Sequence, residues 1–158
     1  MTYEELLTSA DNNQLITKEK PLLISKGRIK GKRIAISKSL TEREKKCVLA
    51  EELGHYHTGS GDILDQFSVS NRKQELRGRL WAYDRLIGLR GIVAAHVSGC
   101  RNVSDVAEYL DVTEDFLQEA LLCYRQKYGV HVKLDNYVIY FEPYVGVFEL
   151  NSDTTLFL

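Results

Sequence analysis

Two carboxylates and an imidazole stand close together at residues 50–55, which read AEELGH. If this stretch is helical, Glu51 and His55 lie on one face, about 6 Å apart along the helix axis, and both can bind one metal ion. Glu52 is rotated by about 100° from Glu51, so its carboxylate stands beside that ion instead of binding it. A general base for a water molecule activated by the metal belongs there. The spacing therefore indicates a metal-dependent hydrolytic site.

A catalytic site with one metal ion usually takes three protein ligands and leaves one position open for water. Glu75 is the candidate for the third ligand, because it falls in the first turn of the next expected helix. Asp62 and Asp65, in the intervening loop, remain open alternatives. His57 lies two residues beyond His55, so a continuing helix turns it away from that face.

An ordinary interpretation competes with the metal site. The pattern E-E-x-x-H arises often by chance on amphipathic helices, where it forms a solvated acidic face with a histidine near the helix end. The choice between the two interpretations depends on the elements that hold these residues.

Two helices are expected to carry the candidate ligands. The first begins after Thr41, which with Glu44 forms the pattern of a capping box, and it ends at Gly59. The second, NRKQELRGRLWAYDRLIGL, has Asn71 as its expected cap and apolar residues at helical spacing. A helix, a loop and a second helix returning beside the first would bring Glu75 toward His55.

The rest of the chain alternates between short helices and strands. We expect a helix over residues 2–10, two strands joined by a basic turn within 21–37, a helix over 91–99, and two helices within 102–129 capped by Ser104 and Thr113. The tail, NYVIYFEPYVGVFEL, has the pattern of a hairpin. These elements predict a single α+β domain over 1–158, with a mostly helical core and N-terminal hairpin in 1–128 and a C-terminal β-hairpin in 129–158.

The composition and net charge of the chain argue against several classes of protein. The 158 residues carry a net charge of −1 and are 44% hydrophobic, which is enough for one folded core and gives no global attraction to nucleic acid or membranes. We find no signal-peptide pattern and no apolar run long enough to span a bilayer, so we expect a cytoplasmic protein without membrane contact. Cys47, Cys100 and Cys123 are widely spaced and are expected to be reduced thiols.

Two further stretches bear on possible partners. Residues 102–129 have the pattern of a helix-turn-helix, but the second helix begins TEDFLQEAL, and its acids would repel a phosphate backbone. Direct binding to nucleic acid is therefore disfavoured. The basic hairpin SKGRIKGKR is either a solvated turn or a surface for an acidic patch on a partner.

The stretches KKCVLAEELGHYHTGSGDILD and NRKQELRGRLWAYDRLI resemble the ImmA/IrrE family of metallo-endopeptidases, and more narrowly its branch in prophages and integrative elements of Gram-positive bacteria. That resemblance implies a zincin-like core and the metal motif H-E-x-x-H with a later glutamate. Mapped onto this chain, Glu51 takes the first ligand position, Glu52 is the base, His55 is the second ligand and Glu75 is the later glutamate. The family's implied substrate is a helix-turn-helix repressor encoded beside the peptidase.

The chain departs from the family pattern at Glu51, where the motif has histidine. Two carboxylates and one imidazole form a harder ligand set, so zinc remains the first expectation while manganese and iron are admitted. Two anionic ligands also make the activated water less acidic, which leaves more of the activation to Glu52. We therefore expect a slow or conditional hydrolase. The alternative is a non-catalytic module that keeps the peptidase fold and binds and inactivates a repressor or another partner protein.

Overall fold

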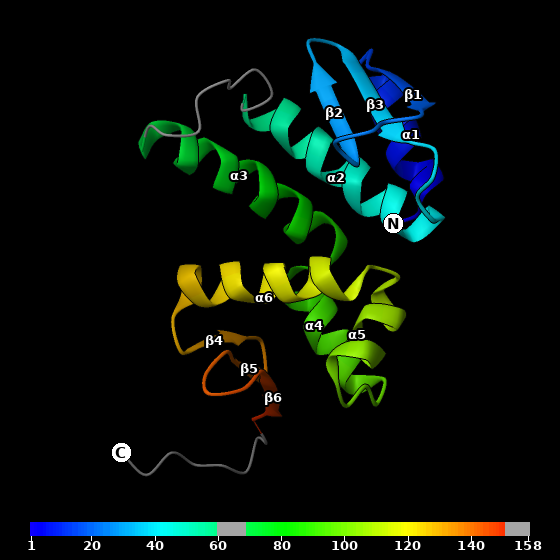
Figure 1. The fold of residues 1–158 in the computed structure, drawn as a ribbon. Helices are drawn as coiled ribbons and strands as arrows, with labels where there is room; N and C mark the ends of the chain where they lie inside the picture. Colours follow the sequence, from blue (N-terminus) through cyan, green and yellow to red (C-terminus); the bar gives the residue numbers. More distant parts are fainter. Residues whose placement is uncertain (60–68, 151–158) are drawn as a thin grey trace.

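The computed structural model describes residues 1–59 and 69–150 and has the predicted α+β architecture (Figure 1). The described residues form six helices and six strands, with three strands near each end of the chain and five consecutive helices between them. They are α1 (Tyr3–Asn12), β1 (Ile16–Lys20), β2 (Gly27–Lys30), β3 (Arg33–Ser37), α2 (Glu42–Thr58), α3 (Val69–Leu86), α4 (Gly88–Val97), α5 (Val103–Leu110), α6 (Glu114–Tyr128), β4 (His131–Leu134), β5 (Tyr137–Tyr140) and β6 (Gly146–Glu149). The division into a single domain with the boundaries given above stays a prediction.

The N-terminal sheet is mixed, which differs from the antiparallel hairpin that we expected. β2 and β3 form that hairpin through a tight turn at Gly31 and Lys32, and β3 matches the predicted strand RIAIS. An additional strand, β1, pairs with β3 in parallel, which gives the order β1-β3-β2. The sequence ITKEK conceals this strand because four of its five residues are exposed, so it shows no alternation of apolar and polar residues. β3 is therefore the central strand of the sheet, and β2 lies at one of its edges.

The ends of α2 follow the sequence prediction. Thr41 accepts a hydrogen bond from the Glu44 backbone N–H, and the Glu44 carboxylate accepts one from the Thr41 backbone N–H, which completes the capping box. Gly59 ends the helix in the left-handed region, with φ of 74°. Two other caps differ from expectation: α3 begins at Val69, so that Asn71 lies inside its first turn, and Asn102 caps α5 in place of Ser104.

The C-terminal segment forms a three-stranded antiparallel sheet, not the hairpin predicted from the tail alone. β5 and β6 are the expected pair, and β4 adds to the free side of β5 through a two-residue turn at Asp135 and Asn136. Asp135 has φ of 53°, a conformation that Asp and Asn tolerate better than most residues. The Asp-Asn pair is thus a turn signal that the sequence contained.

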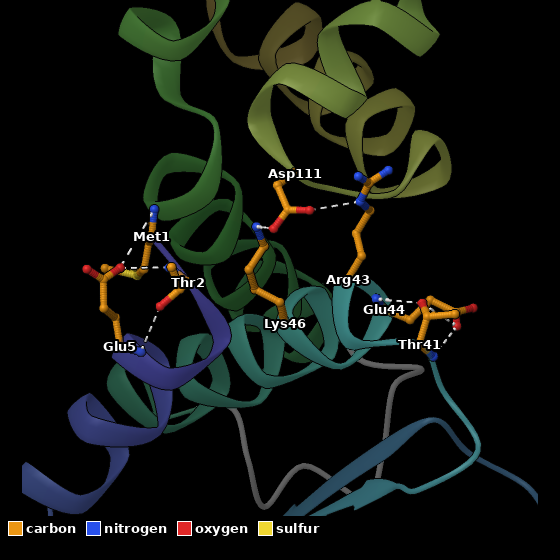
Figure 2. Close-up of polar contacts among 8 residues, drawn as sticks. All are labelled: Met1, Thr2, Glu5, Thr41, Arg43, Glu44, Lys46 and Asp111. Carbon is orange, nitrogen blue, oxygen red and sulfur yellow. Dashed lines mark hydrogen bonds and ion pairs between the residues drawn. The ribbon is translucent and has the colours of Figure 1, made fainter.

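A buried lysine links α2 to the end of α5. The Lys46 side chain is 2% exposed, and its Nζ lies 2.6 Å from Asp111 Oδ2, while Arg43 reaches the other carboxylate oxygen of Asp111 at 2.9 Å (Figure 2). Asp111 also ends α5 in the left-handed region. One carboxylate therefore neutralises a buried charge and joins the N-terminal helices to the C-terminal ones.

Replacing Asp111 by Asn is expected to lower the free energy of unfolding by about 2 kcal/mol. Asparagine tolerates the left-handed backbone, so the loss comes from a buried Lys46 without a counterion, reduced because Asp111 itself is half-exposed. Urea denaturation measures this difference. Arg43→Gln is the control, since it removes only the exposed ion pair and is expected to cost less than about 1 kcal/mol. Equal losses in both variants would contradict a special role for Lys46.

Two other expectations concern the chain as a whole. No helix among residues 1–59 and 69–150 is long and apolar enough to cross a membrane. Cys47, Cys100 and Cys123 are free thiols, as predicted.

Candidate active site

Two glycines bring the helices that carry the candidate ligands into close contact. A Cβ atom on Gly54 would lie 2.1 Å from the backbone oxygen of Gly78, so only a residue without a side chain fits there. Gly54 lies on α2, one residue before His55, and Gly78 lies on α3, three residues after Glu75. The two helices run past each other in opposite directions (Figure 1). This contact is what allows side chains from α2 and α3 to meet.

Gly54→Ala is expected to lower the free energy of unfolding by about 2 kcal/mol, because backbone atoms of α3 cannot move aside as a side chain can. Thermal unfolding should show a fall of roughly 4–8 °C for a chain of this size. The matched control is Gly91→Ala on α4, where the added methyl meets only the end of the Leu110 side chain at 3.2 Å. An unchanged melting temperature for Gly54→Ala would show that the helices separate without cost.

Burial raises the pKa of both neighbouring carboxyls on α2. The pKa of Glu51 rises to about 7, first through burial and then through repulsion by Glu119 and Glu75, although Arg79 opposes the rise. The pKa of Glu52 rises to about 7 through burial and through repulsion by Glu51 and Glu75, opposed by a hydrogen bond from the Ile29 backbone N–H. A carboxylate whose pKa lies near neutrality is suited to accept and return a proton.

His55 and Glu75 form a pair between the two helices. Their facing atoms, Nδ1 and Oε2, lie 3.5 Å apart. Burial lowers the pKa of His55, although the charge of Glu75 opposes the shift. The imidazole is therefore held toward its neutral form, which is the form that binds metal ions.

Arg79 is a member of the site that the sequence analysis did not name. Its Nε lies 3.1 Å from Glu75 Oε1, and its charge also lowers the pKa of Glu51. Arg79 stands four residues after Glu75 on α3, a spacing that favours exactly this ion pair on a helix, so a local signal was present. Glu119 of α6 faces Glu51 only because α6 packs across α3, and no local pattern indicates that contact.

Glu51 and Glu52 line a cleft of about 330 Å³ between α2, the N-terminal sheet and α6. On one side stands Gly27 of β2, where an added Cβ would lie 3.1 Å from Glu52 Oε1 and 2.3 Å from a Val48 methyl carbon. Arg79 and the first turns of α6 form the other side. The cleft therefore places two proton-binding carboxyls beside an edge strand.

His57 lies apart from this cluster. His57 is exposed and stacks on Trp81 of α3, with ring centroids 4.7 Å apart, as expected for a residue turned away from His55. Asp62 and Asp65, the alternative third ligands, lie outside the described residues.

The two carboxylates and the imidazole of this site are suitable ligands for a divalent metal ion. Two ligands on one tetrahedral zinc ion stand about 3.4 Å apart for bonds of about 2.1 Å, close to the 3.5 Å between His55 Nδ1 and Glu75 Oε2. Within the described residues, no three His, Cys, Asp or Glu side chains are grouped closely enough to hold an ion. Glu75 is instead paired with Arg79, whose Nε lies 3.1 Å from Glu75 Oε1. The ligand set Glu51, His55 and Glu75 stays a prediction.

A family model described as the IrrE N-terminal-like domain, which defines a peptidase family, matches residues 8–122. The chain belongs to this family. The match begins within α1 and ends within α6, so it includes every candidate site residue, while β4–β6 lie beyond it. It confirms the resemblance to ImmA/IrrE proteins, whereas the prophage branch stays a prediction. No curated protein and no solved structure matches the chain significantly.

Proposed function

We propose that this IrrE-like protein is a metal-dependent endopeptidase that cleaves a helix-turn-helix repressor. The observation that carries the proposal is the position of Glu52, a largely buried carboxyl with a pKa of about 7 in a cleft beside an edge strand, in a chain of a peptidase family. A general base with these properties takes a proton from water and passes it to a leaving amine near neutral pH.

β2 offers a means to hold the substrate. Its outer side has no neighbouring strand in the described part of the chain, and its residue Gly27 adjoins Glu52. An extended peptide that paired with this edge would gain backbone hydrogen bonds and run past the Glu52 carboxylate. Cleavage of an extended segment between folded parts of a repressor is consistent with such a groove.

Glu51, His55 and Glu75 would hold the metal ion. The ion supplies Lewis acidity, which polarises a peptide carbonyl and makes water more acidic. Neutral His55 is ready to bind, and the Glu75 carboxylate would exchange Arg79 for the metal. Arg79 would then be free to interact with the substrate or with Glu119. Zinc is the first expectation, with manganese or iron as alternatives because of the two carboxylates.

A second function, binding without cleavage, is favoured by Arg79. This guanidinium neutralises part of the acidic cluster, so the fold offsets some of the site's negative charge without a metal ion. Such a module would inactivate a repressor by holding it. The two functions share the cleft and differ in whether a peptide bond breaks.

The test is incubation of the purified protein with the repressor encoded beside its gene, with added zinc, with added manganese and with a chelator. Two repressor fragments that form only with metal, and whose termini identify one cleaved bond, are expected. A stable complex with an intact repressor under all three conditions would favour the binding module and contradict the endopeptidase. Location in the cytoplasm is part of the proposal, since the repressor acts there.

A further inference from the structure

The N-terminal sheet has a strongly basic outer face on the side opposite α2. Its register places alternate residues of each strand on this face, because partners in adjacent strands share a side. Ile34 and Ile36 are buried on the inner side, so their neighbours Arg33 and Ala35 point outward. We call this the basic face, and its five cations are Lys18, Lys20, Arg28, Lys30 and Arg33.

The charge of the basic face is not balanced by the protein. Residues 16–38 hold eight of the 21 lysines and arginines but one of the 22 acids, in a chain of net charge −1. That acid, Glu19, is engaged by Lys45 at 2.7 Å. In the described ranges, none of the five cations of the basic face takes part in an ion pair. Lys30 stands directly opposite Arg33, an arrangement of like charges that destabilises a sheet.

The centre of the basic face is hollow. Ala35 sits in the middle strand, with Lys18 opposite it on β1 and Arg28 opposite it on β2. Because alanine is small and its two neighbours are long, a groove of about 450 Å³ runs along β3 between rows of cations. Ile16, which is 52% exposed, adds an apolar contact at one end. A groove with an apolar floor and cationic walls fits an extended chain that carries negative charges.

We propose that the basic face docks an acidic peptide segment, the segment belonging to the protein on which the active-site cleft acts. The identity of the protein that carries this segment rests on the proposed function, whereas the acidic character of the segment follows from the basic face. Carboxylates of the segment pair with the cations on β1 and β2, and its small or apolar side chains lie over Ala35 and Ile16. Such pairing steers association and fixes the register of the bound chain.

The composition of the face favours a peptide over nucleic acid. No aromatic ring on which bases could stack and no Asn or Gln that could read a base edge belongs to the groove lining. The rest of the chain also carries an excess of acids, which repels a long polyanion more than a short peptide.

β2 connects the basic face to the active-site cleft. An added Cβ at Gly27 would meet Glu52, and the Ile29 backbone N–H donates a hydrogen bond to the Glu52 carboxylate. Arg28 and Lys30, which alternate with these residues, lie on the opposite side of the sheet. A substrate that lies along the β2 edge therefore has only to pass around one strand to reach the basic face. Docking there adds affinity without occupying the cleft.

The test measures binding of a fluorescein-labelled octapeptide rich in glutamate and alanine by fluorescence anisotropy, using the full chain without any substrate. We expect saturable binding that weakens as salt rises, and no binding of the same peptide with glutamine in place of glutamate. The double variant Lys18→Glu, Arg28→Glu is expected to lose at least tenfold in affinity. Lys133→Glu, on exposed β4, should stay within about twofold.

Three results would overturn the proposal: equal binding of the glutamine peptide, unchanged affinity in the double variant, or tighter binding of a single-stranded or duplex oligonucleotide than of the acidic peptide. The neutral pair Lys18→Gln, Arg28→Gln serves if charge reversal impairs folding, and it should also lose several-fold in affinity. Glu52→Gln should bind the peptide like wild type. Loss of catalysis and loss of docking are thereby distinguishable.

Discussion

Replacing Glu52 by glutamine is expected to reduce the rate of repressor cleavage by about 10²–10⁴-fold, the range typical of a lost general base. Glutamine has nearly the shape of glutamate and can still accept the hydrogen bond from the Ile29 backbone, so the cleft keeps its form. What it cannot do is take a proton from water. The measurement is the rate of fragment formation under conditions where the metal and the repressor are in excess.

Glu44→Gln is the matched control for this prediction. Glu44 lines the same cleft on the same helix, but its carboxylate is committed to the capping box with Thr41, which glutamine also supports. Its cleavage rate should stay within about threefold of wild type. Repressor binding by Glu52→Gln should be unchanged, and cleavage by Glu52→Gln at the wild-type rate would refute the assigned role of Glu52.

Replacing Glu51 by glutamine is expected to stabilise the metal-free protein by about 2–3 kcal/mol at pH 8. The pKa of Glu51 rises from 4.5 to about 7 on folding, a shift that costs about 1.4 kcal/mol for each unit. Loss of this charge also relieves Glu52, while Arg79 keeps Glu75 as its ion-pair partner at 3.1 Å. For a chain of this length the gain corresponds to a rise of roughly 5–10 °C in melting temperature.

The stabilisation by Glu51→Gln is expected to grow as the pH rises. Below about pH 4.5 the carboxyl is protonated in both the folded and unfolded chain, so glutamine brings no advantage. As the pH rises toward 7, the unfolded chain ionises first and wild type loses stability. Above pH 7 both states are ionised and the full cost remains. Thermal unfolding of both proteins in chelator between pH 4 and 8 measures the difference.

Zinc should reverse the order of the two proteins. A metal that binds only the folded wild type, at a thousandfold excess over its dissociation constant, adds about 4 kcal/mol, whereas the Glu51→Gln variant lacks one ligand and gains less. If Glu51→Gln is no more stable than wild type at pH 8 without metal, then burial and repulsion do not destabilise the Glu51 carboxylate.

The sequence predicted α2 closely because its signals are local. Thr41, Glu44 and Gly59 act through hydrogen bonds and backbone conformation within one helical turn, so they define both ends of α2 whatever packs against it. The spacing from Glu51 to His55 likewise follows from helix geometry alone. The approach of His55 to Glu75 needed α3 as well. The pattern of a helix, a loop and a returning helix predicted it, and the contact between Gly54 and Gly78 makes it possible.

Other features depend on contacts between distant segments. β1 has no hydrophobic alternation and is a strand only because it pairs with β3 across the hairpin. Glu119 lines the same cleft as Glu51 because α6 packs against α3, and nothing near Glu119 in the sequence indicates this packing. The ion pair between Arg79 and Glu75 could have been predicted from their spacing of four residues on a helix. Arg79 changes the interpretation of the site because it supplies a positive charge where the sequence predicted only a metal ion.

The central claim, that Glu51, His55 and Glu75 bind a metal ion, is tested most directly by elemental analysis of the purified protein. Wild type, Glu51→Ala and Glu75→Ala are prepared without an affinity tag that binds metal and are then equilibrated with zinc, manganese or iron(II). We expect close to one ion per chain in wild type and loss of that ion in both variants. A wild-type protein that remains empty with all three metals, or variants that keep their ion, would show that these residues are not the ligands.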